Sequence, residues 1–101
     1  MKDPENPLLP AAELSDPASG RRMTVFTTEP GVQLYTANTL GGVRGKGGKA
    51  YGPHEAVCLE TQHFPNSMAH PEFPSIVLKA GEQYDSETVL FFGLTEESGK
   101  E

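Results

Sequence analysis

The order of apolar and polar residues along the chain predicts short β-strands and no long helix. Apolar and β-branched residues gather in short runs, and proline or glycine stands in most of the turns between them. No segment repeats apolar residues at helical spacing with capping residues at its ends. Short strands divided by turns favour an all-β fold, an antiparallel β-sandwich. The strands predicted on this basis are residues 11–15, 23–28, 32–36, 56–62, 75–79 and 87–94.

Two of these strands carry polar side chains on one face. Side chains alternate between the two faces of a strand, so Gln33 lies opposite in direction to Leu34 in the strand at 32–36. In the strand at 56–62, Glu60 points away from the apolar side chains. Acidic side chains are almost never fully buried without a partner. Glu60 therefore faces solvent, pairs with a base or works in a cleft, and the residues alone leave these three alternatives open.

The segments between the strands have compositions typical of loops. Residues 41–52 hold six glycines with basic residues between them, but no Ser or Thr follows a Gly-Lys pair, as a phosphate-binding loop requires. A mobile surface loop is favoured there. Residues 63–74 hold three prolines and cannot form a regular element, so Phe64 and Phe73 are expected to pin this loop to the body. The predicted organisation is a disordered lead at 1–10, a body at 11–94 and a polar tail at 95–101.

Composition and charge exclude several classes of partner. The chain has 101 residues and a net charge of -6, from 14 acidic and 8 basic residues, so it lacks the basic face that nucleic acid requires. No apolar run approaches the roughly 20 residues of a membrane-spanning helix. The acids and prolines of residues 1–7 differ from a signal peptide, so a cytoplasmic location is expected. Cys58 is the only cysteine, which rules out an internal disulfide and a cysteine metal cluster. Its apolar surroundings predict a small buried side chain.

Five blocks of sequence resemble one enzyme family. They are TTEPGVQLYTAN at 27–38, CLETQ at 58–62, PN at 65–66, PEFP at 71–74 and LKAGEQY at 78–84. In this order and at these spacings they resemble the C-terminal portion of the aldose 1-epimerases, also called galactose mutarotases. The resemblance extends over roughly residues 11–94. It implies an antiparallel β-sandwich of the galactose-mutarotase type, part of a larger supersandwich, with a sugar groove on its concave face.

The resemblance also implies a reaction. A mutarotase interconverts the α and β anomers of aldohexoses such as galactose or glucose by opening and closing the sugar ring. This chemistry needs a general base and a general acid, and no cofactor or metal is expected. The CLETQ block assigns the base to Glu60, and the match at PGVQ assigns a contact with a sugar hydroxyl to Gln33.

The sequence also departs from the family. Family members are several-fold longer, and their general-acid histidine, a second histidine, and the arginine and aspartate that hold the sugar come from upstream segments absent here. His54, His63 and His70 do not lie in those motifs and are expected to be loop or surface residues. The chain is therefore expected to be a fragment, whether a truncated product, a split subunit or a short homologue, and weakly active or inactive alone.

The expected partners follow from the fragment interpretation. Besides the aldohexose, they are further copies of this chain through self-association, or a complementary N-terminal chain, since an open sheet edge and an uncovered apolar face promote association. Two alternatives belong to other classes of protein. A non-catalytic carbohydrate-binding module would use the same groove without turnover, and a structural remnant would need a partner chain.

Overall fold

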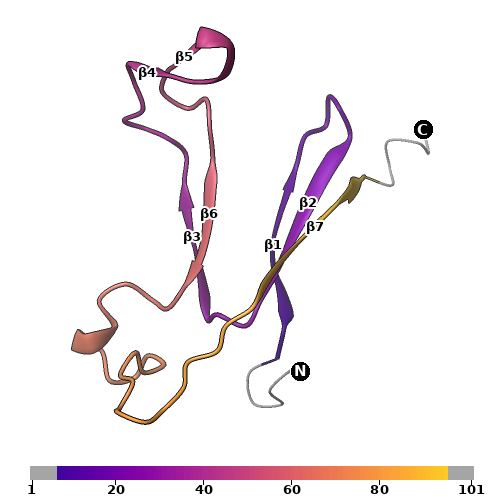
Figure 1. Cartoon of the computed structure of the whole chain (residues 1–101). Helices are drawn as coiled ribbons and strands as arrows, with labels where there is room; N and C mark the ends of the chain where they lie inside the picture. Colours follow the sequence, from indigo (N-terminus) through magenta and orange to yellow (C-terminus); the bar gives the residue numbers. More distant parts are fainter. Residues whose placement is uncertain (1–6, 96–101) are drawn as a thin grey trace.

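The computed structural model describes residues 7–95, which form antiparallel β-structure with two short 3₁₀ turns (Figure 1). The predicted all-β, antiparallel fold is confirmed. Residues 1–6 and 96–101, which hold most of the expected lead and tail, lie outside the described residues. The elements are β1 (Leu9–Ser15), β2 (Arg21–Thr27), β3 (Gly31–Tyr35), β4 (Val43–Arg44), η1 (Lys46–Gly48), β5 (Ala50–Tyr51), β6 (Cys58–Gln62), η2 (Ser67–Ala69) and β7 (Thr88–Leu94).

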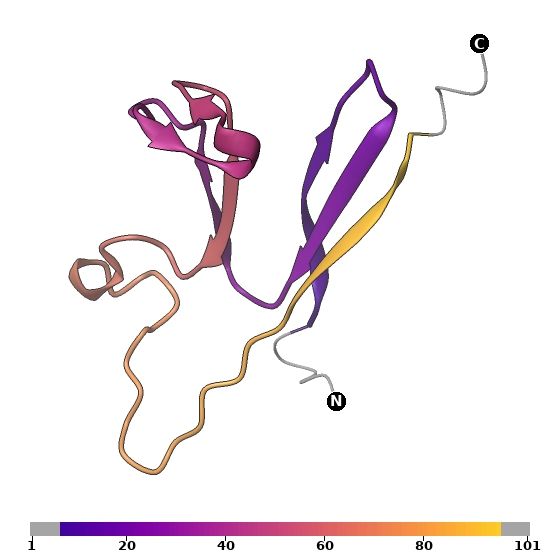
Figure 2. The same ribbon diagram turned by 45° about the horizontal axis from the view of Figure 1, so that its top comes forward.

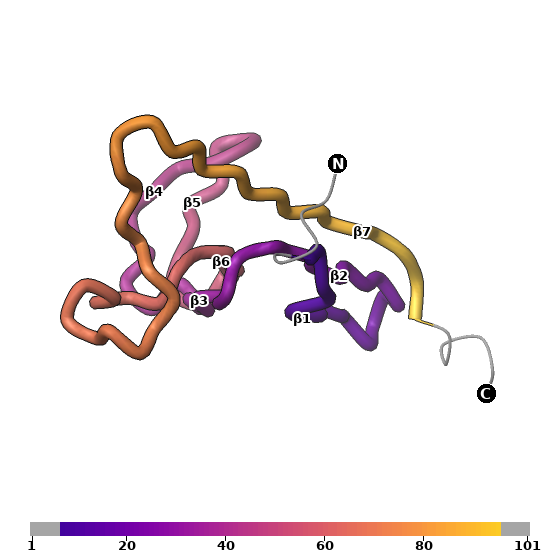
Figure 3. Tube along the Cα trace, turned by 90° about the horizontal axis from the view of Figure 1, so that it is seen from below, coloured from indigo at the N-terminus to yellow at the C-terminus, as the bar shows by residue number. Residues whose placement is uncertain are grey.

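The strands form two arms that diverge from a bend at residues 28–30 (Figures 1 and 2). One arm is a three-stranded sheet in the order β1-β2-β7, with both pairs antiparallel. The other arm is the antiparallel ribbon β3–β6, and the small hairpin β4–β5 lies beyond it. Residues 74–87 run without a strand from the loop after β6 to the start of β7, as the orange tube of Figure 3 shows.

Most strand predictions are confirmed within one or two residues, and the exceptions have physical causes. The strand predicted at 75–79 is wrong, because no neighbouring strand pairs with this segment and its Ile76, Val77 and Leu78 are 45–56% exposed. β1 begins at Leu9, so it includes two residues of the expected lead. The glycine-rich residues 41–52 form the exposed hairpin β4–β5, which η1 closes with positive φ at Gly47 and Gly48.

Few of the described residues are fully buried, and two of them, Val25 and Thr27, lie in the central strand β2 of the sheet. Among the described residues, Val25 (1% exposed) and Ala37 (3%) are the only apolar residues that are fully buried. Val25 lies in the central strand β2, in register with Ala12 of β1 and Leu90 of β7. By contrast, the outer strand β7 leaves large apolar side chains in solvent, among them Phe92 at 69%. The described part of the chain therefore has a very small core and a large uncovered apolar surface.

No helix within residues 7–95 has the length and apolar character needed to cross a membrane.

Candidate functional site

The ribbon β3–β6 places Gln33 directly opposite Glu60. The register pairs Tyr35 with Cys58, Gln33 with Glu60 and Gly31 with Gln62. Residues opposite each other in an antiparallel pair point to the same face, with Cβ atoms about 4.5–5.5 Å apart. The structure therefore brings the two site residues predicted from separate blocks of sequence onto one face.

The chemical surroundings of Glu60 are open. Glu60 and Gln33 are both exposed, and within residues 7–95 the carboxylate of Glu60 has no hydrogen-bond or ion-pair partner. Of the three alternatives left by the sequence, the structure shows a solvent-facing carboxylate, here beside an amide. A carboxylate can accept a proton, and an amide both donates and accepts hydrogen bonds. The pair can therefore bind a hydroxyl-rich ligand and remove a proton from it.

The ribbon begins at a close contact between Gly31 and an aromatic ring. A Cβ atom on Gly31 would lie 2.8 Å from a ring carbon of Phe64, so only glycine lets the ring pack here. The ring of Phe64 meets Phe73 edge-on at a centroid distance of 5.2 Å, and Phe73 stacks on His70 at 4.7 Å. The expectation that Phe64 and Phe73 hold this loop to the body is confirmed for Phe64, which ties the loop to the first residue of β3.

The three histidines lie in loops, as expected, and each has a partner other than Glu60. Nδ1 of His54 lies 3.1 Å from the Thr36 carbonyl oxygen. Nδ1 of His70 lies 3.2 Å from Oε2 of Glu72. His63 contacts Glu29, as described below. Within residues 7–95 no group of three or more His, Cys, Asp or Glu side chains is placed to hold a metal ion.

Cys58 corrects one expectation from the sequence. We expected a buried thiol, but Cys58 is exposed. It lies on the same face of β6 as Glu60, opposite Tyr35. The apolar neighbours in sequence were misleading because they point to the other face, and strand alternation was the better signal.

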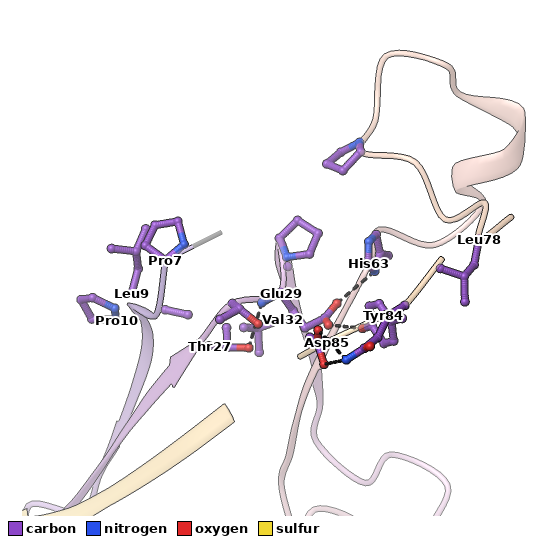
Figure 4. A pocket seen from close by; sticks show the side chains of 16 residues that line it. Pro7, Leu9, Pro10, Thr27, Glu29, Val32, His63, Leu78, Tyr84 and Asp85 are labelled. Carbon is purple, nitrogen blue, oxygen red and sulfur yellow. Dashed lines mark hydrogen bonds and ion pairs between the residues drawn. The ribbon is translucent and has the colours of Figure 1, made fainter. Parts of the chain in front are cut away.

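A second polar cluster lies at the bend and was missed by the sequence analysis. The Glu29 carboxylate accepts hydrogen bonds from the hydroxyls of Tyr84 and Ser86. Its Oε1 lies 3.0 Å from Nδ1 of His63, and Figure 4 shows the contacts with His63 and Tyr84. Only 6% of the Glu29 side chain is exposed. Oε1 makes no hydrogen bond of good geometry within the described residues, and its contact with His63 is an ion pair only when the imidazole is protonated. We name Glu29, His63, Tyr84 and Ser86 the bend cluster.

The electrostatics of the bend cluster favour a charged Glu29. Burial tends to raise the pKa of Glu29, but the hydrogen bonds from Ser86 and Tyr84 and the nearby His63 outweigh it and lower the pKa below its ordinary value of 4.5. Donation to this carboxylate raises the pKa of the Tyr84 hydroxyl. Glu29 precedes Pro30 and Gly31, so its local sequence is typical of a turn. The hydroxyl donors lie 55 and 57 residues away, and nothing in the local sequence indicates them.

The bend cluster borders a groove that is separate from the Gln33–Glu60 pair. The groove has a volume of about 970 Å³ and lies between the start of β1, the bend and residues 74–85 (Figure 4). Glu29, His63 and Tyr84 line it together with prolines and leucines, whereas Gln33 and Glu60 do not. The molecule thus has an exposed polar pair on the ribbon and a buried carboxylate at the bend.

The chain is similar to proteins of known activity. Residues 3–90 match the family described as Aldose 1-epimerase. Galactose mutarotase of Rattus norvegicus is 45% identical over 84 residues, which are 82% of this chain and 25% of that protein, and the Homo sapiens protein gives the same figures. Aldose 1-epimerase of Escherichia coli (strain K12) is 38% identical over 73 residues, 70% of this chain and 21% of that protein. The chain therefore spans about a quarter of the length of the curated relatives it matches.

Proposed function

Because the chain belongs to the aldose 1-epimerase family, we propose that it contributes the base side of a mutarotase active site. In this proposal Glu60 is the general base and Gln33 binds the sugar. One observation carries it: the register of β3 and β6 places these two side chains opposite each other on one face. The substrate would be an aldohexose such as galactose or glucose, because the relatives are named as galactose mutarotases and aldose 1-epimerases.

Each residue has a defined task in the proposed reaction. Glu60 removes the proton of the anomeric hydroxyl, which allows the ring to open, and a general acid protonates the ring oxygen. Rotation about the bond to the carbonyl carbon and closure on the other face then give the second anomer. The amide of Gln33 can donate to one sugar oxygen and accept from another hydroxyl, which would hold the anomeric carbon near the base. No step requires a cofactor.

The general acid would come from polypeptide outside the described residues. His54, His63 and His70 all contact groups other than Glu60. The apolar side chains of β7 are exposed, and contiguous exposed apolar surface marks interaction sites. This observation supports the binding of further polypeptide at β7. We propose that the remainder of a mutarotase sandwich covers it, whether in a longer chain, in a complementary chain or by self-association. A cytoplasmic location belongs to the same proposal, in keeping with the free thiol of Cys58.

A carbohydrate-binding module is the second candidate, and the open surroundings of Glu60 favour it. Binding needs only hydrogen-bonding groups such as Gln33 and Glu60, whereas turnover needs an acid as well. The two functions differ in what happens when the missing acid is provided.

A chimera provides that acid and tests the proposal. The segment of rat galactose mutarotase that corresponds to this chain is replaced by this chain, and the conversion of pure α-galactose is followed by polarimetry. We expect an active chimera, and Glu60→Gln should lower kcat by about 10²–10⁴-fold. Glu13→Gln, an exposed glutamate on β1, is the matched control and should leave kcat unchanged. An active chimera that tolerates Glu60→Gln would refute the assignment of the base, and a folded chimera that binds galactose without turnover would favour the binding module.

A further inference from the structure

Few contacts determine the angle between the two arms. The chain passes from the sheet to the ribbon through the short bend between Thr27 and Gly31. The arms then diverge (Figure 2), so contacts near the bend hold the ribbon in place. A two-stranded ribbon is marginally stable by itself, and its orientation depends on what it is fastened to. The groups at the bend therefore decide where Gln33 and Glu60 lie relative to the rest of the molecule.

The carboxylate of Glu29 joins three segments at this point. Glu29 belongs to the bend itself, His63 follows the end of β6, and Tyr84 and Ser86 precede β7. The ribbon and the outer strand of the sheet are thus tied to one carboxylate. Figure 4 shows the Glu29 carboxylate facing both His63 and Tyr84, with a dashed line to each. Hydrogen bonds to a charged group are roughly twice as strong as neutral ones. Removal of the carboxylate would release the exposed hydroxyls of Tyr84 and Ser86 to water, so the segments would lose their common acceptor.

A chain of threonine hydroxyls runs alongside the bend cluster. Oγ1 of Thr27, which is 3% exposed, lies 3.0 Å from Oγ1 of Thr88, and Oγ1 of Thr88 lies 2.9 Å from Oγ1 of Thr61. The amide of Glu29 donates to Oγ1 of Thr27 at 3.0 Å. Thr61 is the neighbour of Glu60 in β6. Glu29 therefore connects through its side chain to His63, directly after β6, and to the segment before β7, and through its backbone to Thr27 of β2.

We propose that Glu29 is a positioning residue whose carboxylate fixes the angle between the ribbon β3–β6 and the sheet β1–β2–β7. It does not touch the proposed sugar site, since the groove that it borders excludes Gln33 and Glu60. It acts by holding the ribbon on which they lie. The effect of Glu29 on catalysis rests on the proposed function, whereas its effect on the angle between the arms does not.

The chain offers a direct measurement of this angle. Cys58 is the single cysteine, it is exposed, and it lies at the end of the ribbon farthest from the bend. Ser15 is exposed at the far end of β1, across a groove that both arm tips line. Spin labels on Cys58 and on a Ser15→Cys variant of the full chain report the distance between the arms by pulsed electron resonance. With Glu29 intact, and with the labelled chain diluted into an excess of unlabelled chain so that only distances within one chain are measured, we expect one narrow distance peak.

Variants of the bend cluster should broaden the distance distribution or abolish its narrow peak. Glu29→Leu has similar volume and no acceptor, so the narrow peak should be lost, and Glu29→Gln should give an intermediate result because its amide oxygen still accepts. Tyr84→Phe removes one hydroxyl from a 58%-exposed side chain and should broaden the peak without preventing folding. Controls are Glu87→Leu, whose exposed carboxylate has no partner within residues 7–95, and Tyr51→Phe in the distant hairpin. Circular dichroism checks that each variant retains β-structure.

The outcomes separate this proposal from the proposed function. A narrow peak in both Glu29→Leu and Tyr84→Phe would overturn the proposal, and so would a broad distribution in the unsubstituted chain or equal broadening by the controls. In the chimera, Glu29→Gln should lower kcat while leaving the pH dependence of kcat as it is in the unsubstituted chimera, because the base is retained. If Glu60→Gln proves harmless there but the spin-label result holds, the proposed function fails and the positioning role of Glu29 for the ribbon stands.

Discussion

The sheet β1–β2–β7 and the ribbon β3–β6 are both antiparallel, but they differ in burial. The central strand of the sheet contains Val25 and Thr27, at 1% and 3% exposure, whereas no residue of β3 or β6 is fully buried. Buried apolar area is the main source of stability, so the sheet stabilises the fold. The ribbon instead displays Gln33 and Glu60. Stability and candidate chemistry are therefore placed on different arms, and the bend cluster is what relates one to the other.

The two arms also differ in which groups they leave without a partner. The ribbon carries the proposed base Glu60, whose carboxylate has no partner within residues 7–95, and the sheet has an outer strand with exposed Phe91 and Phe92. In the proposed function, additional polypeptide would supply the general acid beside Glu60 and would cover the apolar side chains of β7.

The largest expected effect concerns the activity of the chain alone. Without a general acid, the catalysed rate of mutarotation should be lower than that of a full-length mutarotase by at least about 10²–10⁴-fold. Lost orientation of the sugar should reduce the rate further. Size-exclusion chromatography followed by polarimetry on the same fraction tests this. Self-association is expected in the chromatogram, and a monodisperse monomer with full activity would contradict the prediction.

Core substitutions should distinguish the sheet from the ribbon in stability. Val25→Ala removes two buried carbons and should lower the free energy of unfolding by about 2 kcal/mol. Leu34→Ala, at a side chain that is 59% exposed, should cost about 0.5 kcal/mol or less. Urea denaturation followed by circular dichroism measures both. Equal costs would show that the ribbon is packed in solution.

On the ribbon, Gln33→Ala should weaken sugar binding without unfolding the protein. A lost hydrogen bond to a sugar hydroxyl is worth about 0.5–1.5 kcal/mol. The Kd for galactose in the chimera, measured by calorimetry, should rise accordingly while the thermal midpoint stays constant. Unchanged affinity, or loss of fold, would argue against a sugar-facing position for Gln33.

The smallest expected effect is the pH dependence that Glu29 gives to the free energy of unfolding. The pKa of Glu29 is lowered in the folded state, so its contribution to stability is present above its ordinary value of 4.5 and is lost as the pH falls through the folded-state pKa. Glu29→Gln should therefore be less stable than the unsubstituted chain at neutral pH, and the difference should shrink in acid. Denaturation at several pH values tests this with Glu87→Gln as control, because the exposed carboxylate of Glu87 has no partner within residues 7–95. A difference that is constant with pH would rule out the charged carboxylate as its source.

The local residue pattern was sufficient to locate most strands and the polar side chains of the candidate site. Alternation of apolar and polar residues is a local property, so it located β2, β3, β6 and β7 and placed Gln33 and Glu60 on the polar faces of their strands. The resemblance to the family came from consecutive residues for the same reason. For Cys58 the two local signals disagreed. Its apolar neighbours predicted a buried thiol, whereas strand alternation placed it on the exposed face with Glu60, and the structure agrees with the alternation.

The contacts between segments that are distant in sequence are a property of the tertiary structure, and the local pattern does not specify them. The register that pairs Gln33 with Glu60 depends on how β3 lies against β6, and strand pattern alone does not specify a partner. The segment at 75–79 has strand composition but no strand beside it, so its backbone forms no ladder. Glu29 looked like part of a turn, and it became a buried carboxylate because Tyr84 and Ser86 are brought to it from more than 50 residues away. Burial and hydrogen bonding are properties of contacts distant in sequence, and they appear only once the chain has folded.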